Sequence, residues 1–234
     1  MSKENVSDYL FLDIETVPEY PAYEKAPEKT QILWDKKTLY QRKNGETAGE
    51  FYSKAGIYAE FGKIVCISCG FIDSSYSLRI KSFYGDDETE LLSDFSGMLD
   101  KFSQSRPQAR LCAHNGKEFD FPYIARRTLI RGLPLPAVFN VHKLKPWEIP
   151  FVDTLDLWKF GDYKHTCSLD LLANIFGIAS PKDDIDGSMV AKVYYEDRDI
   201  ARIAHYCEKD VITLTQIFLR IVQESPFKEI ITVQ

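Results

Sequence analysis

Two carboxylates separated by a single residue follow an apolar run near the start of the chain. The run Tyr-Leu-Phe-Leu at positions 9–12 leads directly into Asp13, Ile14, Glu15 and Thr16. A run rich in Phe and Leu is typical of a buried strand. Because side chains alternate along a strand, Asp13 and Glu15 would point to the same face. Like charges held there resist burial unless cations lie between them. The alternative is that the strand has ended and water solvates both acids.

Two further acids stand at the starts or on the faces of expected helices. Asp120 follows a short strand and a polar turn containing Asn115 and Gly116, residues that let a main chain pass close to a ligand. Asp210 lies one helical turn after Tyr206, so the two share a helix face. Taken singly, Asp120 is equally explained as a helix-start residue, and Asp210 as a solvated one.

The elements that must position these residues form an alternating pattern. Apolar runs predict strands at 63–71, 77–83, 110–113 and 151–153, with a hairpin joining the first two. Helical spacing and helix-start and helix-stop residues predict helices at about 88–102, 119–131, 154–160, 168–176 and 197–223. Residues 17–60 read as an insertion of short helices and loops with few core positions. The pattern indicates an α/β protein with a mixed sheet flanked by helices.

Length and composition fit one large domain. The 234 residues are 44% hydrophobic, which suffices for a core. No apolar stretch is long enough for a membrane helix, and five unpatterned cysteines indicate a reducing compartment, so we expect a soluble cytoplasmic protein. The Cys66-x2-Cys69 pair lies in an expected strand and has no second pair to complete a zinc site.

The net charge of −6 does not favour a nucleic-acid partner, but the charges are unevenly distributed. Positions 121–147 hold no acid, and their basic residues are Arg126, Arg127, Arg131, Lys143 and Lys145. They form either a patch that faces phosphates or a solvated helix face with a loop.

Together, the acids and the tyrosine resemble the motifs of the DEDD 3′–5′ exonucleases of the ribonuclease-H-like superfamily. Three motifs occur in order: Phe-Leu-Asp-Ile-Glu-Thr at 11–16, His-Asn-Gly-Lys-Glu-Phe-Asp at 114–120, and Tyr-Cys-Glu-Lys-Asp-Val at 206–211. The likeness is strongest to the tyrosine (DEDDy) branch, to predicted exonucleases related to the proofreading domain of family B DNA polymerases. It implies a ribonuclease-H-like α/β fold, with a mixed five-stranded sheet and helices on both faces. Residues 1–234 would be one exonuclease domain carrying the insertion at 17–60.

The resemblance also implies a metal site. Two divalent cations, Mg²⁺ or Mn²⁺, would cleave the phosphodiester bond, and such hard ions prefer carboxylate ligands. By the resemblance Asp13 bridges both ions, Glu15 and Asp210 bind the ion on the nucleophile side, and Asp120 binds the ion on the leaving-group side. Tyr206 orients the attacking water, since a phenol is a poor base at neutral pH.

Three further residues are expected to contact the substrate by the same resemblance: Thr16, Asn115 and Phe119. Asn115 would contact a phosphate. Phe119 is either a core residue or a platform on which a base stacks. Aromatic residues of the insertion (Trp34, Tyr40, Phe51 and Tyr52) could stack on unpaired bases or pack the insertion onto the sheet.

His205 raises a competing assignment, because it stands five residues before Asp210, the spacing of the histidine branch of the superfamily. Five residues turn a helix about 140° away from the acid, whereas four residues turn it about 40°. Helix geometry therefore favours Tyr206.

The sequence thus predicts a metal-dependent 3′–5′ exonuclease acting on DNA, single-stranded or frayed. The alternatives are an exoribonuclease and a non-catalytic nucleic-acid-binding module with the same fold. A polymerase or repair protein could be a partner in trans.

Overall fold

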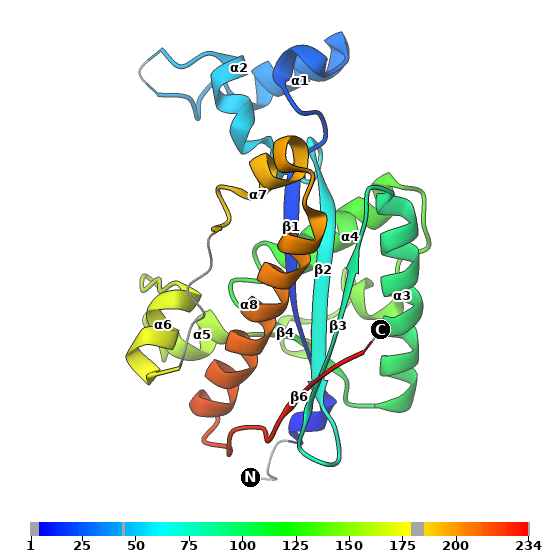
Figure 1. Cartoon of the computed structure of the whole chain (residues 1–234), viewed down its shortest axis with the longest axis vertical. Helices are drawn as coiled ribbons and strands as arrows, with labels where there is room; N and C mark the ends of the chain where they lie inside the picture. The colour runs from blue at the N-terminus through cyan, green and yellow to red at the C-terminus, as the bar shows by residue number, and fades with distance from the viewer. Residues whose placement is uncertain (1–4, 44, 179–184, 234) are drawn as a thin grey trace.

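In the part of the chain that the structure describes, six strands form one mixed sheet in the order β5-β4-β1-β2-β3-β6 (Figure 1). We describe a computed structural model that covers residues 5–43, 45–178 and 185–233. The strands are β1 (Tyr9–Pro18), β2 (Gly62–Ile72), β3 (Leu78–Tyr84), β4 (Arg110–Ala113), β5 (Phe151–Asp153) and β6 (Ile230–Thr232).

The strand that carries the first two acids lies inside the sheet. β1 pairs with β2 in the antiparallel sense and with β4 in the parallel sense. Side chains of β1 alternate between the two faces of the sheet, so they contribute to two separate parts of the core. Leu10, Leu12 and Ile14 pack on one face of the sheet, while Phe11 packs on the other. The expected buried strand is confirmed.

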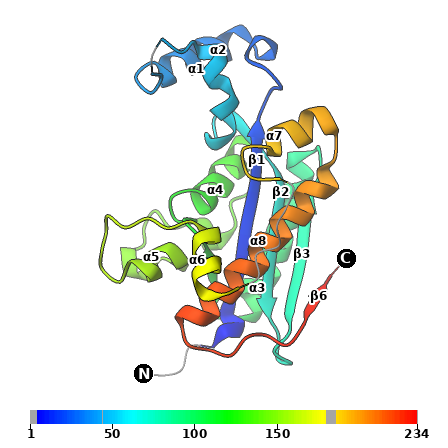
Figure 2. The ribbon, with the colours of Figure 1, turned by 60° about the vertical axis from the view of Figure 1, so that its left-hand side comes forward.

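Helices cover both faces of the sheet, as Figures 1 and 2 show. Residues of α3 and α4 pack with Leu10 and Leu12, and residues of α8 pack with Phe11. The expected helices are confirmed, and the last one runs unbroken. The helices are α1 (Glu28–Thr38), α2 (Ala48–Phe51), α3 (Glu88–Ser105), α4 (Asp120–Ile130), α5 (Thr154–Lys159), α6 (Leu169–Phe176), α7 (Val190–Lys192) and α8 (Ile200–Ile221).

The sheet has one strand more than the five that the sequence predicts. β6 pairs in the parallel sense with Leu78, Arg79 and Ile80 at the outer edge of β3. It is three residues long and largely exposed, so it carries neither the length nor the buried alternation by which strands are recognised. Main-chain hydrogen bonds to β3 hold β6 in the sheet, and such bonds do not depend on a recognisable sequence pattern.

The segment between β1 and β2 has a core of its own, contrary to the expectation of few core positions. Trp34 is fully buried, and the rings of Phe51, Tyr52, Tyr58 and Phe61 surround it. These aromatic side chains therefore pack against one another and are not available to stack on bases. Tyr40 is different, because it is 94% exposed.

Two arginines of the basic stretch are ion-paired inside the protein. The arginine network consists of Arg127, Arg131, Glu19 and Glu88. Arg127 Nη2 lies 2.7 Å from Glu19 and 2.5 Å from Glu88, and Arg131 pairs with the same two acids at 2.8 and 2.5 Å. Glu88 also accepts a hydrogen bond from the main-chain N–H of Ile64. Both the phosphate-facing and the solvated interpretations are therefore wrong for Arg127, and Arg131 is not free to face a phosphate.

Two expectations from the sequence concern the cysteines and the lack of a membrane helix. The five cysteines are free and buried. None of the described helices combines the length and apolarity that crossing a membrane requires.

Candidate active site

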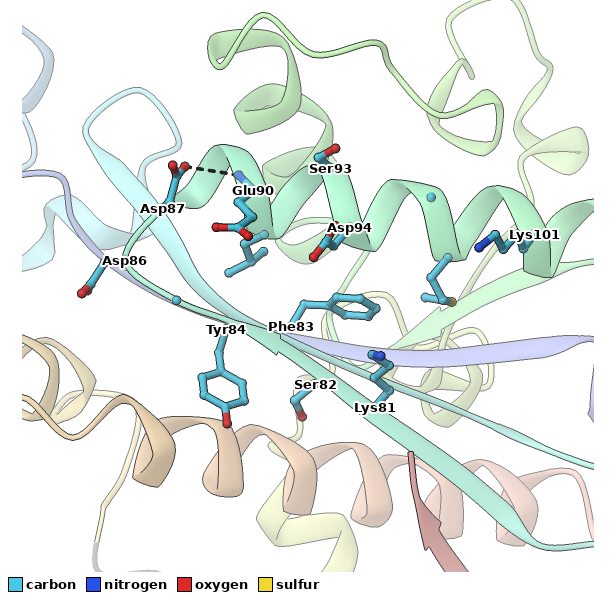
Figure 3. Close-up of a pocket in the computed structure, with 14 residues that line it drawn as sticks. Lys81, Ser82, Phe83, Tyr84, Asp86, Asp87, Glu90, Ser93, Asp94 and Lys101 are labelled. Atoms are coloured by element: carbon cyan, nitrogen blue, oxygen red, sulfur yellow. Dashed lines mark hydrogen bonds between the residues drawn. The ribbon is translucent and has the colours of Figure 1, made fainter. Parts of the chain in front are cut away.

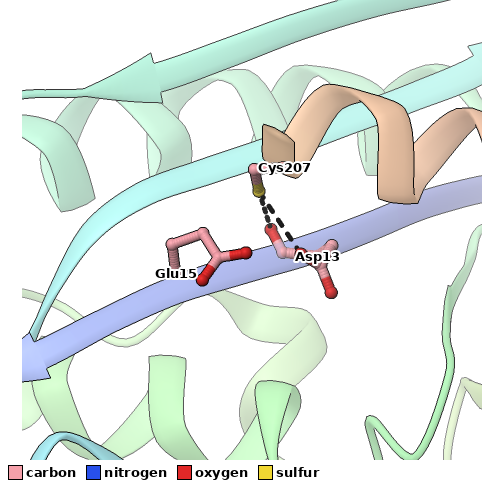
Figure 4. Close-up of side chains that lie close together, drawn as sticks. All are labelled: Asp13, Glu15 and Cys207. Atoms are coloured by element: carbon pink, nitrogen blue, oxygen red, sulfur yellow. Dashed lines mark hydrogen bonds between the residues drawn. The ribbon is translucent and has the colours of Figure 1, made fainter. Parts of the chain in front are cut away.

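Asp13 and Glu15 point to the face of the sheet that α8 covers, as the period of a strand requires. Oxygen atoms of both acids and the sulfur of Cys207, on α8, all lie within 4.8 Å of one another (Figure 4). The register of β1 against β2 shifts between Glu15 and Thr16, directly after the second acid. Such an irregularity re-aims side chains at the end of a ladder.

Asp120 reaches the same place from the first turn of α4. It is 4% exposed and accepts hydrogen bonds from its own main-chain N–H and from that of Ile14, which lies between the two acids of β1. Burial raises the pKa of Asp120 to about 7. Its own N–H opposes the rise, and the charge of Asp153 adds to it.

Asp210 completes the group from the middle of α8. We call Asp13, Glu15, Asp120 and Asp210 the acid cluster. Burial raises the pKa of Asp13 well above its usual value, and the charges of Asp120, Asp210 and Glu15 raise it further, in that order. Burial also raises the pKa of Glu15, with Asp210 as the next largest cause. Three distant parts of the chain therefore converge on Asp13.

Three members of the acid cluster have no basic partner among the described residues. Among the residues that the structure describes, no lysine or arginine forms an ion pair with Asp13, Glu15 or Asp120. Glu15 is 7% exposed, and burying a carboxylate without a cation is costly. Hard oxygen ligands crowded together fit divalent cations such as Mg²⁺ or Mn²⁺.

Tyr206 faces the acid cluster and His205 does not. Tyr206 is half-buried, and its pKa is raised by burial and then by the charges of Asp210, Glu15 and Asp13. His205, the neighbouring residue, is exposed. The helix through this segment is regular, so the four-residue spacing places the tyrosine on the side of the acids.

The turn before Asp120 is fixed by a residue that sequence reasoning missed. Asp153, at the end of β5, accepts hydrogen bonds from the main-chain N–H groups of Asn115 and Lys117 at 2.9 and 3.1 Å. Gly116 is required in this turn, because a Cβ there would lie 2.3 Å from the Cβ of Ala113. Asp153 is also the N-cap of α5, and an acid at a strand end before Thr-Leu was its only sequence signal.

Cys207 is a second residue that the sequence did not single out. Its thiol donates to the main-chain oxygen and to Oδ2 of Asp13, both at 3.4 Å. A buried thiol beside a carboxylate fixes the orientation of that carboxylate by a weak hydrogen bond. Its position directly after Tyr206 was the only signal available.

The three expected substrate contacts lie in different environments. Thr16 is half-buried beside the register shift. Asn115 is exposed, with a left-handed backbone (φ 59°). Phe119 is half-buried, packs against the core beneath α4 and lies 5.3 Å from the ring of Tyr123. These contacts favour the core interpretation of Phe119.

The chain resembles known proteins in its sequence family and in its fold. A family model described as "Predicted 3'-5' exonuclease related to the exonuclease domain of PolB" matches residues 57–226. The chain also resembles the family B DNA polymerase of the hyperthermophilic archaeon Pyrobaculum calidifontis, with a TM-score of 0.59 and 14% sequence identity. The match covers 92% of this chain and 24% of the polymerase chain. At that identity the likeness shows the fold, which is ribonuclease-H-like. No curated protein matches the chain.

Proposed function

The chain belongs to the family of predicted 3′–5′ exonucleases related to the exonuclease domain of PolB, and we propose that it removes nucleotides from the 3′ end of single-stranded or frayed DNA with the help of two divalent cations. The observation that carries the proposal is that the half-buried Asp13 lies among three other acids, while no described lysine or arginine pairs with Asp13, Glu15 or Asp120. DNA as the substrate is supported by the DNA polymerase that shares the fold.

The residues that would hold the cations are the four members of the acid cluster. Divalent ions bound there would lower the pKa of a water molecule and neutralise the charge on the leaving oxygen. In the proposal Asp13 is shared by both ions, Glu15 and Asp210 lie on the side of the attacking water, and Asp120 lies on the side of the leaving group.

The chain's own residues would orient the reactants. Burial and the acid cluster raise the pKa of Tyr206, so its hydroxyl keeps its proton at neutral pH. Tyr206 therefore serves to hydrogen-bond the attacking water and not to deprotonate it. The exposed side chain of Asn115, on a turn held by Asp153, is placed to bind a phosphate of the substrate.

The test is a time course on single strands of DNA and RNA, labelled at either end, in the presence of Mg²⁺, Mn²⁺ or EDTA. We expect stepwise shortening from the 3′ end of DNA, dependence on metal, and loss of activity in Asp13→Ala. Asp100→Ala, which removes an exposed acid from α3, is the matched control and should keep full activity. Cleavage in EDTA, shortening from the 5′ end, or an Asp13→Ala protein as active as the control would each contradict the proposal.

Calorimetry with Mn²⁺ separates an enzyme from a non-catalytic module of the same fold. Binding that Asp13→Ala abolishes and Asp100→Ala preserves supports the metal site. A wild-type protein that binds no Mn²⁺ would exclude the two-ion mechanism even if it bound DNA.

A further inference from the structure

Among the described residues, β6 covers only part of the outer edge of β3. β6 pairs with Leu78, Arg79 and Ile80, and the last hydrogen bond along this edge joins the N–H of Val233 to the carbonyl of Ile80 at 2.8 Å. Main-chain groups of alternate residues point the same way along a strand, so those of Ser82 and Tyr84 also point outward. Within the described ranges, no strand pairs with them on that side.

A cavity of about 730 Å³ runs beside this open edge, between β3 and α3 (Figure 3). Ser82 and Tyr84 both border it. The Ser82 hydroxyl nevertheless lies on the opposite face, where it hydrogen-bonds with Ser68 at 2.7 Å and Glu208 at 2.8 Å. Figure 3 shows Tyr84 on that face too. It is therefore the main chain of these residues that the cavity exposes.

Gly97 keeps the opposite wall of the cavity open. It lies in the middle of α3, where glycine is less favourable to the helix than alanine. A Cβ at this position would meet nothing within 4 Å, so no packing constraint of the chain itself requires glycine there. The residue leaves space alongside the free edge.

The charges around the cavity are separated along its length. Asp86, Asp87, Glu90 and Asp94 border it together with Lys81 and Lys101. Figure 3 shows Asp86 and Asp87 at one end and the two lysines toward the other. Phe83 and Met98 supply apolar surface. All four acids are exposed, and Glu90 and Asp94 stand one helical turn apart on α3.

We propose that this groove binds an extended peptide of a partner protein, which pairs with β3 beyond the end of β6 and places basic side chains against Glu90 and Asp94. Strand addition explains the open main-chain groups, and side chains on alternate residues would read the wall formed by α3. A negative charge of the peptide would meet Lys81 and Lys101. The groove lies on the α3 face of the sheet and the acid cluster on the α8 face, so both could be occupied at once.

The test uses two fluorescein-labelled peptides with blocked ends, Lys-Thr-Lys-Thr-Val-Thr-Glu and the same residues in reverse order. Their charges on alternate residues match the groove in either strand direction. We expect saturable binding of at least one peptide in fluorescence anisotropy. Gly97→Tyr, which fills the groove, and Asp94→Lys, which reverses a charge, should each weaken it about tenfold or more.

Asp100→Lys is the matched control, because it makes the same charge change on α3 outside the groove. It should bind the peptide as the wild type does, and all three variants should keep their exonuclease activity and melting temperature. A peptide in which Glu replaces each Lys, and Lys replaces Glu, should bind the Asp94→Lys variant more tightly than it binds the wild-type protein.

Three results would overturn the proposal. One is that neither peptide binds saturably, and another is that Asp100→Lys weakens binding as much as Asp94→Lys does. The third is a dimer in sedimentation that Gly97→Tyr dissociates, which would assign the edge to a second copy of the chain.

Discussion

Two groups of buried or half-buried carboxylates in this protein differ in what surrounds them. In the arginine network, Glu88 is 3% exposed and receives hydrogen bonds from both arginines and from a main-chain N–H. In the acid cluster, the neighbours of Asp13 are other acids, and among the described residues the only donor to its carboxylate is the thiol of Cys207. In the arginine network, the negative charge of Glu88 is therefore paired with positive charge. In the acid cluster, Asp13, Glu15 and Asp120 have no such basic partners among the described residues, as the proposed cation site requires.

The same substitution at one glutamate of each group should have opposite effects. Glu15→Gln removes a charge from the acid cluster, so we expect exonuclease activity to fall about a thousandfold or more. The metal-free protein should be as stable as the wild type, or more stable, because burial raises the pKa of Glu15. Turnover and urea unfolding in EDTA measure the two effects. A Glu15→Gln protein that is inactive because it is unfolded would contradict the distinction.

Glu88→Gln, in the arginine network, should lower stability and leave activity unchanged. It leaves Arg127, which is 2% exposed, with one carboxylate partner in place of two. Breaking a buried pair in this way costs about 3–5 kcal/mol of unfolding free energy. Chemical denaturation measures the loss, and activity per folded molecule should be retained. If Glu88→Gln lost turnover while remaining stable, the arginine network would belong to the active site.

The stability of the metal-free protein should depend on pH through Asp120. Its pKa rises from 3.8 in the unfolded chain to about 7 in the folded one. The stability this group contributes is therefore complete below the lower value and is lost as the pH rises through the higher one. Relative to wild type, Asp120→Asn should gain about 2–3 kcal/mol between about pH 5 and pH 8.

Urea unfolding in EDTA across that range measures the pH effect, and saturating Mn²⁺ should abolish it in the wild type. A wild type whose metal-free stability rises over the same range relative to Asp120→Asn would show that the acid is satisfied by the protein alone.

Tyr206 and His205 test which residue of α8 assists the acid cluster. Tyr206→Phe should lower turnover about 10–100-fold, since it removes the hydroxyl that orients the water. His205→Ala, at an exposed neighbouring position, should change turnover little. Single-turnover rates at saturating metal make the comparison, and equal losses in the two variants would remove the tyrosine assignment.

Cys207 should have the smallest effect. Cys207→Ala removes the weak donor to Asp13, and a hydrogen bond worth about 1 kcal/mol corresponds to a roughly fivefold weaker affinity for Mn²⁺. Cys207→Ser should restore part of that affinity. Titration of Mn²⁺ by calorimetry reports it directly, and an alanine variant with unchanged affinity would show that the thiol only fills space.

The sequence predicted the parts of the site that depend on local periodicity. Asp13 and Glu15 share a face because a strand has a period of two, and Tyr206 joins Asp210 because a helix turns in just under four residues. The ordered motifs then linked these elements to Asp120. Contacts between distant segments were not predictable in this way. Glu19 lies 108 residues before Arg127, and nothing in the local pattern of either residue indicates the other.

The same limit explains the remaining differences. β6 is defined by pairing with β3, and Trp34 is buried by aromatic residues that follow it by a variable number of positions. Cys207 and Asp153 act through hydrogen bonds to residues of other elements. Each of these features depends on contacts between elements that form only on folding. Composition and residue spacing do not predict such contacts.

The dispersal of the acids over β1, α4 and α8 also bears on how the protein is made. A ribosome completes Asp13 well before Asp210. Under the proposed function, a growing polypeptide whose α8 has not docked onto the sheet lacks Asp210 at the site, and it could not cut nucleic acid near the site of translation. The proposed activity would thereby be withheld until the tertiary structure is finished.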